Sequence, residues 1–177
     1  MKKCLMPKSN FQAPNKFFTF SGYTLIEVLV AISILSLLFL AGMASYREFS
    51  RRQALVSVVR QVKADLRLTQ QYAIASKKPA GCTVLDGYYF RVVPSDRYRI
   101  SYYCDPTATL EKEVVLPSGI TISGLAPNLT PSNTIWFKTL GDGTNIPTVP
   151  GSTVITITQT TTSESLTVTV TSGGEIR

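Results

Sequence analysis

Glu27 is the residue whose position most clearly calls for a chemical explanation. It lies four residues into an apolar stretch that starts at Tyr23, directly after Ser21-Gly22. A carboxylate at membrane depth is costly unless it is paired, so a partner is expected. The apolar stretch itself contains no cation. The nearest candidate is the new amino terminus that a cut after Gly22 would create.

The other reactive side chains form no catalytic or metal-binding pattern. The chain has 177 residues with 3 Cys and no His, and therefore lacks the commonest general base and the commonest metal ligand. Three cysteines cannot build a four-thiolate zinc site. The scattered carboxylates give no nucleophile–base arrangement. We therefore expect a protein that is not an enzyme and that uses no cofactor or metal.

The element that must position Glu27 is a long apolar helix. Residues 28–46 (VLVAISILSLLFLAGMASY) contain no charge, and as a helix they would span about 28 Å, close to a hydrocarbon core of about 30 Å. A cleaved secretory signal would have a shorter apolar region, and here Arg47, Arg51 and Arg52 follow in a helical continuation. On hydropathy alone, a plain signal anchor remains an alternative.

The basic residues indicate the topology of this segment. Residues 1–22 hold Lys2, Lys3, Lys8 and Lys16 and no acid, which predicts a cytoplasmic leader. The rest of the chain is then periplasmic or extracellular. Without the leader, 14 of the 18 Lys+Arg remain against 11 Asp+Glu, so a formal charge of +7 falls to +3.

Residues 21–27 (SGYTLIE), followed by a long apolar helix, resemble the class III signal of type IV pilins and type II secretion pseudopilins. The resemblance implies that a prepilin peptidase cuts after Gly22 and methylates the new amino group of Tyr23. It also implies that Glu27 neutralises the amine of a neighbouring subunit during assembly. Phe or Met is more usual at the position of Tyr23.

Two features of this region leave alternatives open. The 22-residue leader is longer than many prepilin leaders, and both Met1 and Met6 could be its start. Ser33, Ser36 and Gly42 are weak helix positions. They could permit local unwinding in a filament, or close packing of helices in the membrane.

Residues 47–78 are predicted to continue the helix with an amphipathic pattern. Lys77-Lys78-Pro79 is expected to end it. The basic residues between Arg51 and Arg67 are interpreted as a solvated face, since no aromatic residues lie among them. The predicted apolar stripe steps by three and four residues and consists of Leu55, Val59, Val62, Leu66, Thr69 and Ala73.

Residues 79–177 are predicted to form a β-rich head, an antiparallel sheet packed on the helix stripe, so the fold class is α+β. Pro94-Ser95-Asp96 is a plausible hairpin connection. The predicted strands are residues 87–93, 97–104, 112–116, 133–140, 153–158 and 165–171.

Cys82 and Cys104 remain after removal of the leader, in a compartment that permits disulfides. A bond between them would contribute about 3 kcal/mol by closing a loop of this length. The alternative is two buried thiols.

The head resembles the H-type minor pseudopilin and FimT-like minor pilin group (GspH/FimT), on residues 66–74 (LRLTQQYAI), 135–143 (IWFKTLGDG) and 173–177 (GGEIR). The resemblance implies a pilin fold and four parts: a leader (1–22), a transmembrane and filament-core helix (23–46), an amphipathic helix (47–78) and a head (79–177). It implies a structural subunit in the bacterial inner membrane with a periplasmic head, later part of a type IV pilus or a secretion pseudopilus.

The partners implied are other pilin or pseudopilin subunits, the prepilin peptidase, the inner-membrane assembly platform and, before assembly, membrane lipid. An adhesin or a DNA-uptake receptor is the alternative function. Residues 141–177 hold one basic residue, Arg177, which argues against DNA binding at the tail. Ordinary sheet-surface charge is the simpler interpretation of a second basic group, made of Lys77, Lys78, Arg91, Arg97 and Arg99.

Overall fold

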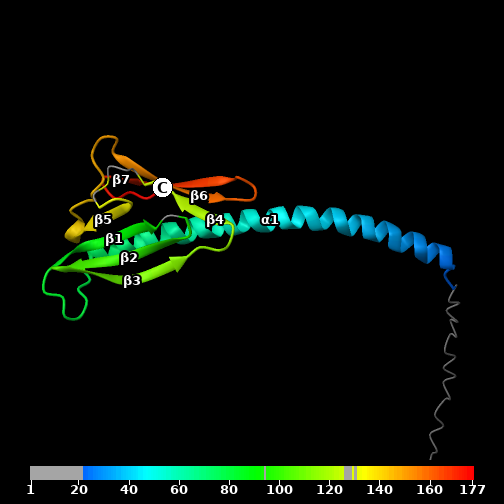
Figure 1. Ribbon diagram of the computed structural model, residues 1–177, viewed down its shortest axis with the longest axis horizontal. Helices are drawn as coiled ribbons and strands as arrows, with labels where there is room; N and C mark the ends of the chain where they lie inside the picture. The colour runs from blue at the N-terminus through cyan, green and yellow to red at the C-terminus, as the bar shows by residue number, and fades with distance from the viewer. Residues whose placement is uncertain (1–21, 94, 126–128, 130) are drawn as a thin grey trace, which may run out of the picture. The chain divides into compact units, whose positions relative to one another are not determined.

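The structure is a computed structural model that describes residues 22–93, 95–125, 129 and 131–177 (Figure 1). It divides into two compact units, with the boundary between Met43 and Ala44. The predicted leader lies outside the described residues, apart from Gly22. The elements are α1 (Leu25–Ile74), β1 (Leu85–Val93), β2 (Arg97–Cys104), β3 (Thr107–Val115), β4 (Ile120–Ser123), β5 (Thr134–Lys138), the 3-10 turn η1 (Thr139–Gly141), β6 (Ser152–Gln159) and β7 (Ser165–Thr171).

In the first unit, α1 carries apolar side chains that the chain itself leaves exposed. Leu37 is 69% exposed and Phe39 is 68% exposed. Ser33 and Ser36 donate their hydroxyl hydrogens to the carbonyl oxygens of Leu29 and Ile32, at 2.8 and 2.7 Å. These bonds within the helix satisfy both hydroxyls in apolar surroundings. The helix continues through Gly42 without interruption.

In the second unit, two antiparallel sheets pack with the rest of α1 around one core. The first sheet has the strand order β3-β2-β1-β5, and the second has the order β4-β6-β7. Figure 1 shows the strands of the first sheet side by side along this part of α1. Six residues of the predicted helix stripe (Leu55, Val59, Val62, Leu66, Thr69, Ala73) are all buried, which confirms the stripe.

The first sheet supplies the bulkiest buried side chains. Tyr88 and Phe90 of β1 and Tyr98 and Ile100 of β2 are at most 1% exposed. The Phe90 and Tyr98 rings stack with centroids 4.9 Å apart. In the second sheet, Ile155 and Ile157 of β6 and Val168 and Val170 of β7 are fully buried, and these aliphatic side chains close the other side of the core.

The α+β prediction is confirmed, but the prediction of one sheet is wrong. The segment 120–123, for which no strand was predicted, forms β4 and opens the second sheet by pairing with β6. It is only four residues long and is flanked by Gly119 and Gly124, both with positive φ. Strands β2 and β7 have the predicted bounds, whereas β3 starts earlier, at Thr107, because it pairs with β2 as far as Cys104.

The end of α1 also differs from the prediction. The helix ends at Ile74 rather than at Lys77-Lys78-Pro79, because Ser76 adopts a left-handed conformation with φ 46°. The amide of Ser76 bonds the carbonyl of Ala73, and the amide of Lys77 bonds that of Tyr72. This pair of bonds is a Schellman motif, which satisfies carbonyls that the helix end leaves free.

Pro94 of the predicted hairpin connection lies outside the described residues, but β1 and β2 pair in antiparallel register up to Val93 and Arg97.

Candidate assembly and anchoring site

Gly22 and Tyr23 lie before α1 and are open to solvent. Tyr23 is 79% exposed, and a Cβ atom built on Gly22 would meet no heavy atom within 4 Å. The fold of the described chain therefore imposes no packing reason for glycine at position 22.

Glu27 lies in the first turn of α1, three residues after the residue that caps the helix. The hydroxyl oxygen of Thr24 accepts the backbone N–H of Glu27 at 3.3 Å. This is the first half of a capping box, in which a Thr and an acid three residues later share the free amides of a helix start. The partial positive charge of a helix N-terminus favours a carboxylate here by a modest amount. Among the described residues Glu27 makes no ion pair.

The helix that follows Glu27 is long and apolar enough to cross a membrane. Its most apolar 18-residue window has a mean hydropathy of 2.5 and buries nothing within the chain. This is what a membrane anchor, or a helix later covered by neighbouring subunits, requires.

Asp65 joins α1 to the first sheet. It is 5% exposed, and its Oδ2 atom accepts a hydrogen bond of 2.6 Å from the Tyr98 hydroxyl. The Lys112 ammonium lies 2.7 Å from Oδ1 and 2.9 Å from Oδ2. Three elements, α1, β2 and β3, therefore meet at one carboxylate.

The contacts of Asp65 compensate for the free-energy cost of burying its charge. Removing a charge from water is compensated only when a counter-charge and hydrogen bonds replace the lost hydration. Asp65 has both. Burial, followed by the hydrogen bond to Asp65, raises the pKa of Tyr98 far above its ordinary value, so the phenol remains a donor. No signal in the sequence beyond its place beside the apolar stripe points to Asp65, so its role and those of Tyr98 and Lys112 were not predicted.

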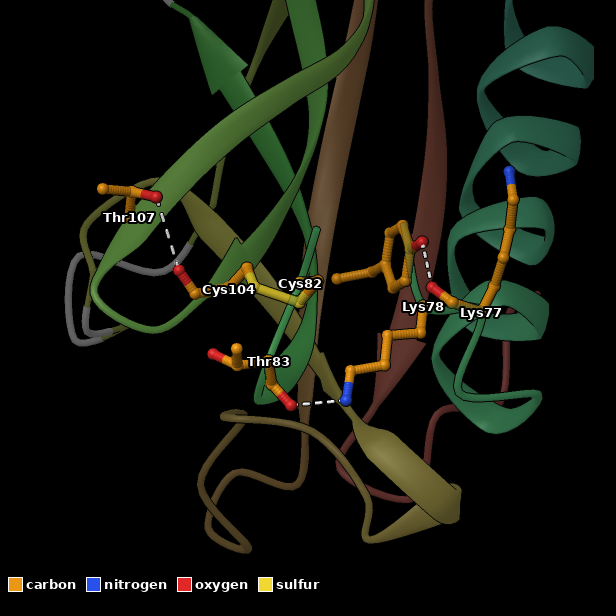
Figure 2. Close-up of a disulfide and its surroundings, with 7 residues drawn as sticks. Lys77, Lys78, Cys82, Thr83, Cys104 and Thr107 are labelled. Carbon is orange, nitrogen blue, oxygen red and sulfur yellow. Dashed lines mark hydrogen bonds between the residues drawn. A yellow bond between two sulfur atoms is a disulfide. The ribbon is translucent and has the colours of Figure 1, made fainter. Parts of the chain in front are cut away.

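A disulfide joins the segment after α1 to the end of β2 (Figure 2). Cys82 and Cys104 are bonded, with Cα atoms 5.7 Å apart, so the predicted bond is present and the alternative of two thiols is wrong. Figure 2 shows the ammonium of Lys78 donating to the carbonyl of Thr83 beside the bond. The Thr107 hydroxyl donates to the carbonyl of Cys104 at 3.4 Å.

The same segment is fixed at the end of α1. The buried Tyr88 donates its hydroxyl hydrogen to the carbonyl of Lys77 at 2.7 Å. The Lys77 ammonium lies 3.9 Å from the centroid of the Tyr72 ring and 3.3 Å from a carboxylate oxygen of Glu111. The helix end is therefore attached to β1 and β3 as well as through the disulfide.

Among the arginines of the second basic group, on the head, ion pairs neutralise most of the charge, in keeping with the interpretation as ordinary sheet-surface charge. Arg97 pairs with Asp96 and Glu113, Arg99 pairs with Glu113, and only Arg91 of the three sheet arginines makes no ion pair within the described part of the chain.

The C-terminal tail is not available as a cationic arm. It pairs with β7, since the amide of Arg177 bonds the carbonyl of Thr169 and the amide of Thr169 bonds that of Arg177. The Arg177 guanidinium is engaged by both carboxylate oxygens of Glu175, at 2.9 and 3.0 Å. Neither basic group supports the DNA-receptor alternative.

Comparison with protein families gives two matches along the chain. The prokaryotic N-terminal methylation motif matches residues 19–43, which include the Gly22–Glu27 segment and most of the apolar helix. The family described as type II transport protein GspH matches residues 58–174, which include the Asp65 contacts, the disulfide and strands β1 to β7. Searches of curated proteins and of solved structures found no match.

Proposed function

The chain belongs to the type II transport protein GspH family, and from this we propose that it is a pseudopilin of a type II secretion system, anchored in the inner membrane with its head in the periplasm. The two family matches support the coarser statement that the chain is a minor pseudopilin or pilin that assembles into a pseudopilus or pilus, and its family is structural rather than catalytic. The main support for this proposal is that one chain contains both the methylation motif and the GspH domain.

We place cleavage between Gly22 and Tyr23, with methylation of the Tyr23 amine. Both residues lie in an exposed segment before α1, where a peptidase can reach the backbone. Open space around Gly22 supports a role in recognition rather than in packing. The partners that process and assemble the chain would be the prepilin peptidase and an inner-membrane platform.

Glu27 would act as the assembly acid. Once Tyr23 is the first residue, Thr24 still caps α1 and Glu27 stays in its first turn. A carboxylate in the apolar stretch, without a counter-charge among the described residues, can be neutralised by the amine of a neighbouring subunit. This pairing would favour docking of the subunit at the base of a growing filament.

Replacing the acid tests this role. We expect Glu27→Gln to be cleaved normally but not to be incorporated with other pseudopilin subunits, as followed by immunoblot of the processed chain and of crosslinked subunit complexes in the membrane fraction. Glu48→Gln is the matched control, because it removes the same charge from an exposed position of α1 outside the apolar run. Incorporation of Glu27→Gln at the level of Glu48→Gln would contradict the proposal.

A further inference from the structure

The face of the first sheet that points away from α1 carries aromatic rings that have no role in the proposed cleavage at Gly22 or in the proposed pairing of Glu27. Because strand residues alternate between faces, Tyr89 points opposite to the buried Tyr88 and Phe90. The Tyr89 ring stacks on that of Trp136, with centroids 5.5 Å apart and an interplanar angle of 19°. The Tyr103 ring meets Tyr89 edge-on at 6.3 Å.

A hollow of about 260 Å³ opens on this face. Tyr89, Tyr103 and Ala108 give it a mainly apolar wall, and Arg91, Ser101 and Thr134 contribute polar groups. A small number of polar groups in a mainly apolar concavity is the usual composition of a binding site. Burial raises the pKa of Tyr89 to about 12.

Arg91 provides an uncompensated charge at this hollow. It is exposed, and it lies directly across from Arg99 in the β1–β2 register, where like charges destabilise a sheet. The carboxylate of Glu113 lies 3.2 Å from the Arg99 guanidinium, whereas no described carboxylate pairs with Arg91. An anionic group bound in the hollow would therefore relieve the repulsion between the two arginines.

We propose that this hollow binds the carboxylate side chain of an exposed peptide segment on a partner protein. The carboxylate would pair with Arg91, and apolar neighbours in the segment would cover the Tyr89 and Tyr103 rings. This inference rests on the sheet surface and is independent of the role of Glu27.

A nucleic acid fits the same surface less well. A phosphate backbone needs several cations in succession, and here Arg97 and Arg99 are already engaged by Glu113.

The test uses the full chain in detergent micelles and a fluorescein-labelled, amidated pentapeptide, Gly-Leu-Asp-Leu-Gly, followed by fluorescence anisotropy. The control peptide has Asn in place of Asp. We expect saturable binding that weakens at least about 10-fold in Arg91→Gln, since a hydrogen bond to a charged group contributes roughly 1.5–3 kcal/mol. Arg60→Gln, which removes an exposed arginine from α1, should bind as the unmodified chain does.

Three results would overturn the proposal: no saturable binding of the Asp peptide, equal affinity for the Asp and Asn peptides, or an equal loss in Arg60→Gln and Arg91→Gln. Tighter binding of a labelled single-stranded oligothymidylate, lost in Arg91→Gln, would also overturn it in favour of a nucleic-acid surface. Unchanged Trp136 fluorescence in the Arg91→Gln chain shows that its sheet is intact, since Trp136 is the sole tryptophan.

Discussion

The Tyr98 hydroxyl donates a 2.6 Å hydrogen bond to the carboxylate of Asp65, across the interface between β2 and α1. Both side chains are buried, and Lys112 of β3 supplies the counter-charge. In an otherwise apolar interface this bond has a defined direction. It therefore fixes how the helix is placed against the sheet, which apolar contacts alone constrain less strictly.

Tyr98→Phe is expected to lower the free energy of unfolding of the head by about 1.5–3 kcal/mol, because the buried carboxylate loses one donor. The measurement is urea denaturation of the full chain in micelles, followed by Trp136 fluorescence. Tyr103→Phe is the matched control, since it removes the same oxygen from a half-buried tyrosine on the other face of β2. Equal effects of the two substitutions would contradict a specific role for the Asp65 bond.

Stability is expected to fall in alkaline solution between about pH 10 and pH 12. Burial raises the pKa of Tyr89 from 10.0 to about 12 and raises that of Tyr98 further. In this range the unfolded chain loses phenolic protons that the folded chain keeps, so unfolding becomes more favourable as pH rises. Denaturation midpoints measured against pH should show this decline, and Tyr89→Phe should reduce it. A midpoint that stays constant to pH 12 would show that neither phenol is protected.

Loss of the disulfide is expected to lower the free energy of unfolding by about 3 kcal/mol, because Cys82 and Cys104 close a loop with a sequence separation of 22. The double variant Cys82→Ser, Cys104→Ser and the reduced unmodified chain should have the same denaturation midpoint. A thiol reagent should not label the folded mature protein before reduction. Labelling of two thiols without reductant would refute the bond.

Gly87→Ala is expected to destabilise the head by about 1–3 kcal/mol, the usual effect of overpacking. A Cβ atom at this position would lie 2.2 Å from the indole nitrogen of Trp136 and 2.5 Å from the carbonyl oxygen of Phe137. Gly173→Ala is the control, because its Cβ would meet its nearest heavy atom, the Thr171 hydroxyl, at 3.9 Å. The same denaturation assay applies, and equal midpoints for the two variants would contradict this packing.

Periodicity made the helix and most strands predictable. The stripe from Leu55 to Ala73 repeats at helical spacing and is buried as expected, and alternation of Val and Thr gave the bounds of β7. Strand β4 was missed because four residues between glycines carry too short a pattern. Its absence from the prediction also merged two sheets into one, since β4 pairs with β6 and not with the first sheet.

Glu27 and Asp65 differ in how easily the sequence alone identifies them as important. Glu27 stands out because it is the sole acid in an apolar segment. Asp65 does not, because an acid on an amphipathic helix is ordinary, and its partners Tyr98 and Lys112 are 33 and 47 residues away in the chain. Only the pairing of β2 with β3 across from α1 brings these three residues together.

The most direct test of the central claim is mass spectrometry of the N-terminal peptide of the mature protein, purified from membranes of its native host. We expect a chain that begins at Tyr23 and carries one methyl group on its α-amine. Gly22→Val should instead yield the uncleaved precursor, while Gly42→Ala, whose Cβ also meets open space, should be processed normally. A mature unmodified protein that keeps residues 1–22, or begins elsewhere, would contradict the assignment of this chain as a processed filament subunit.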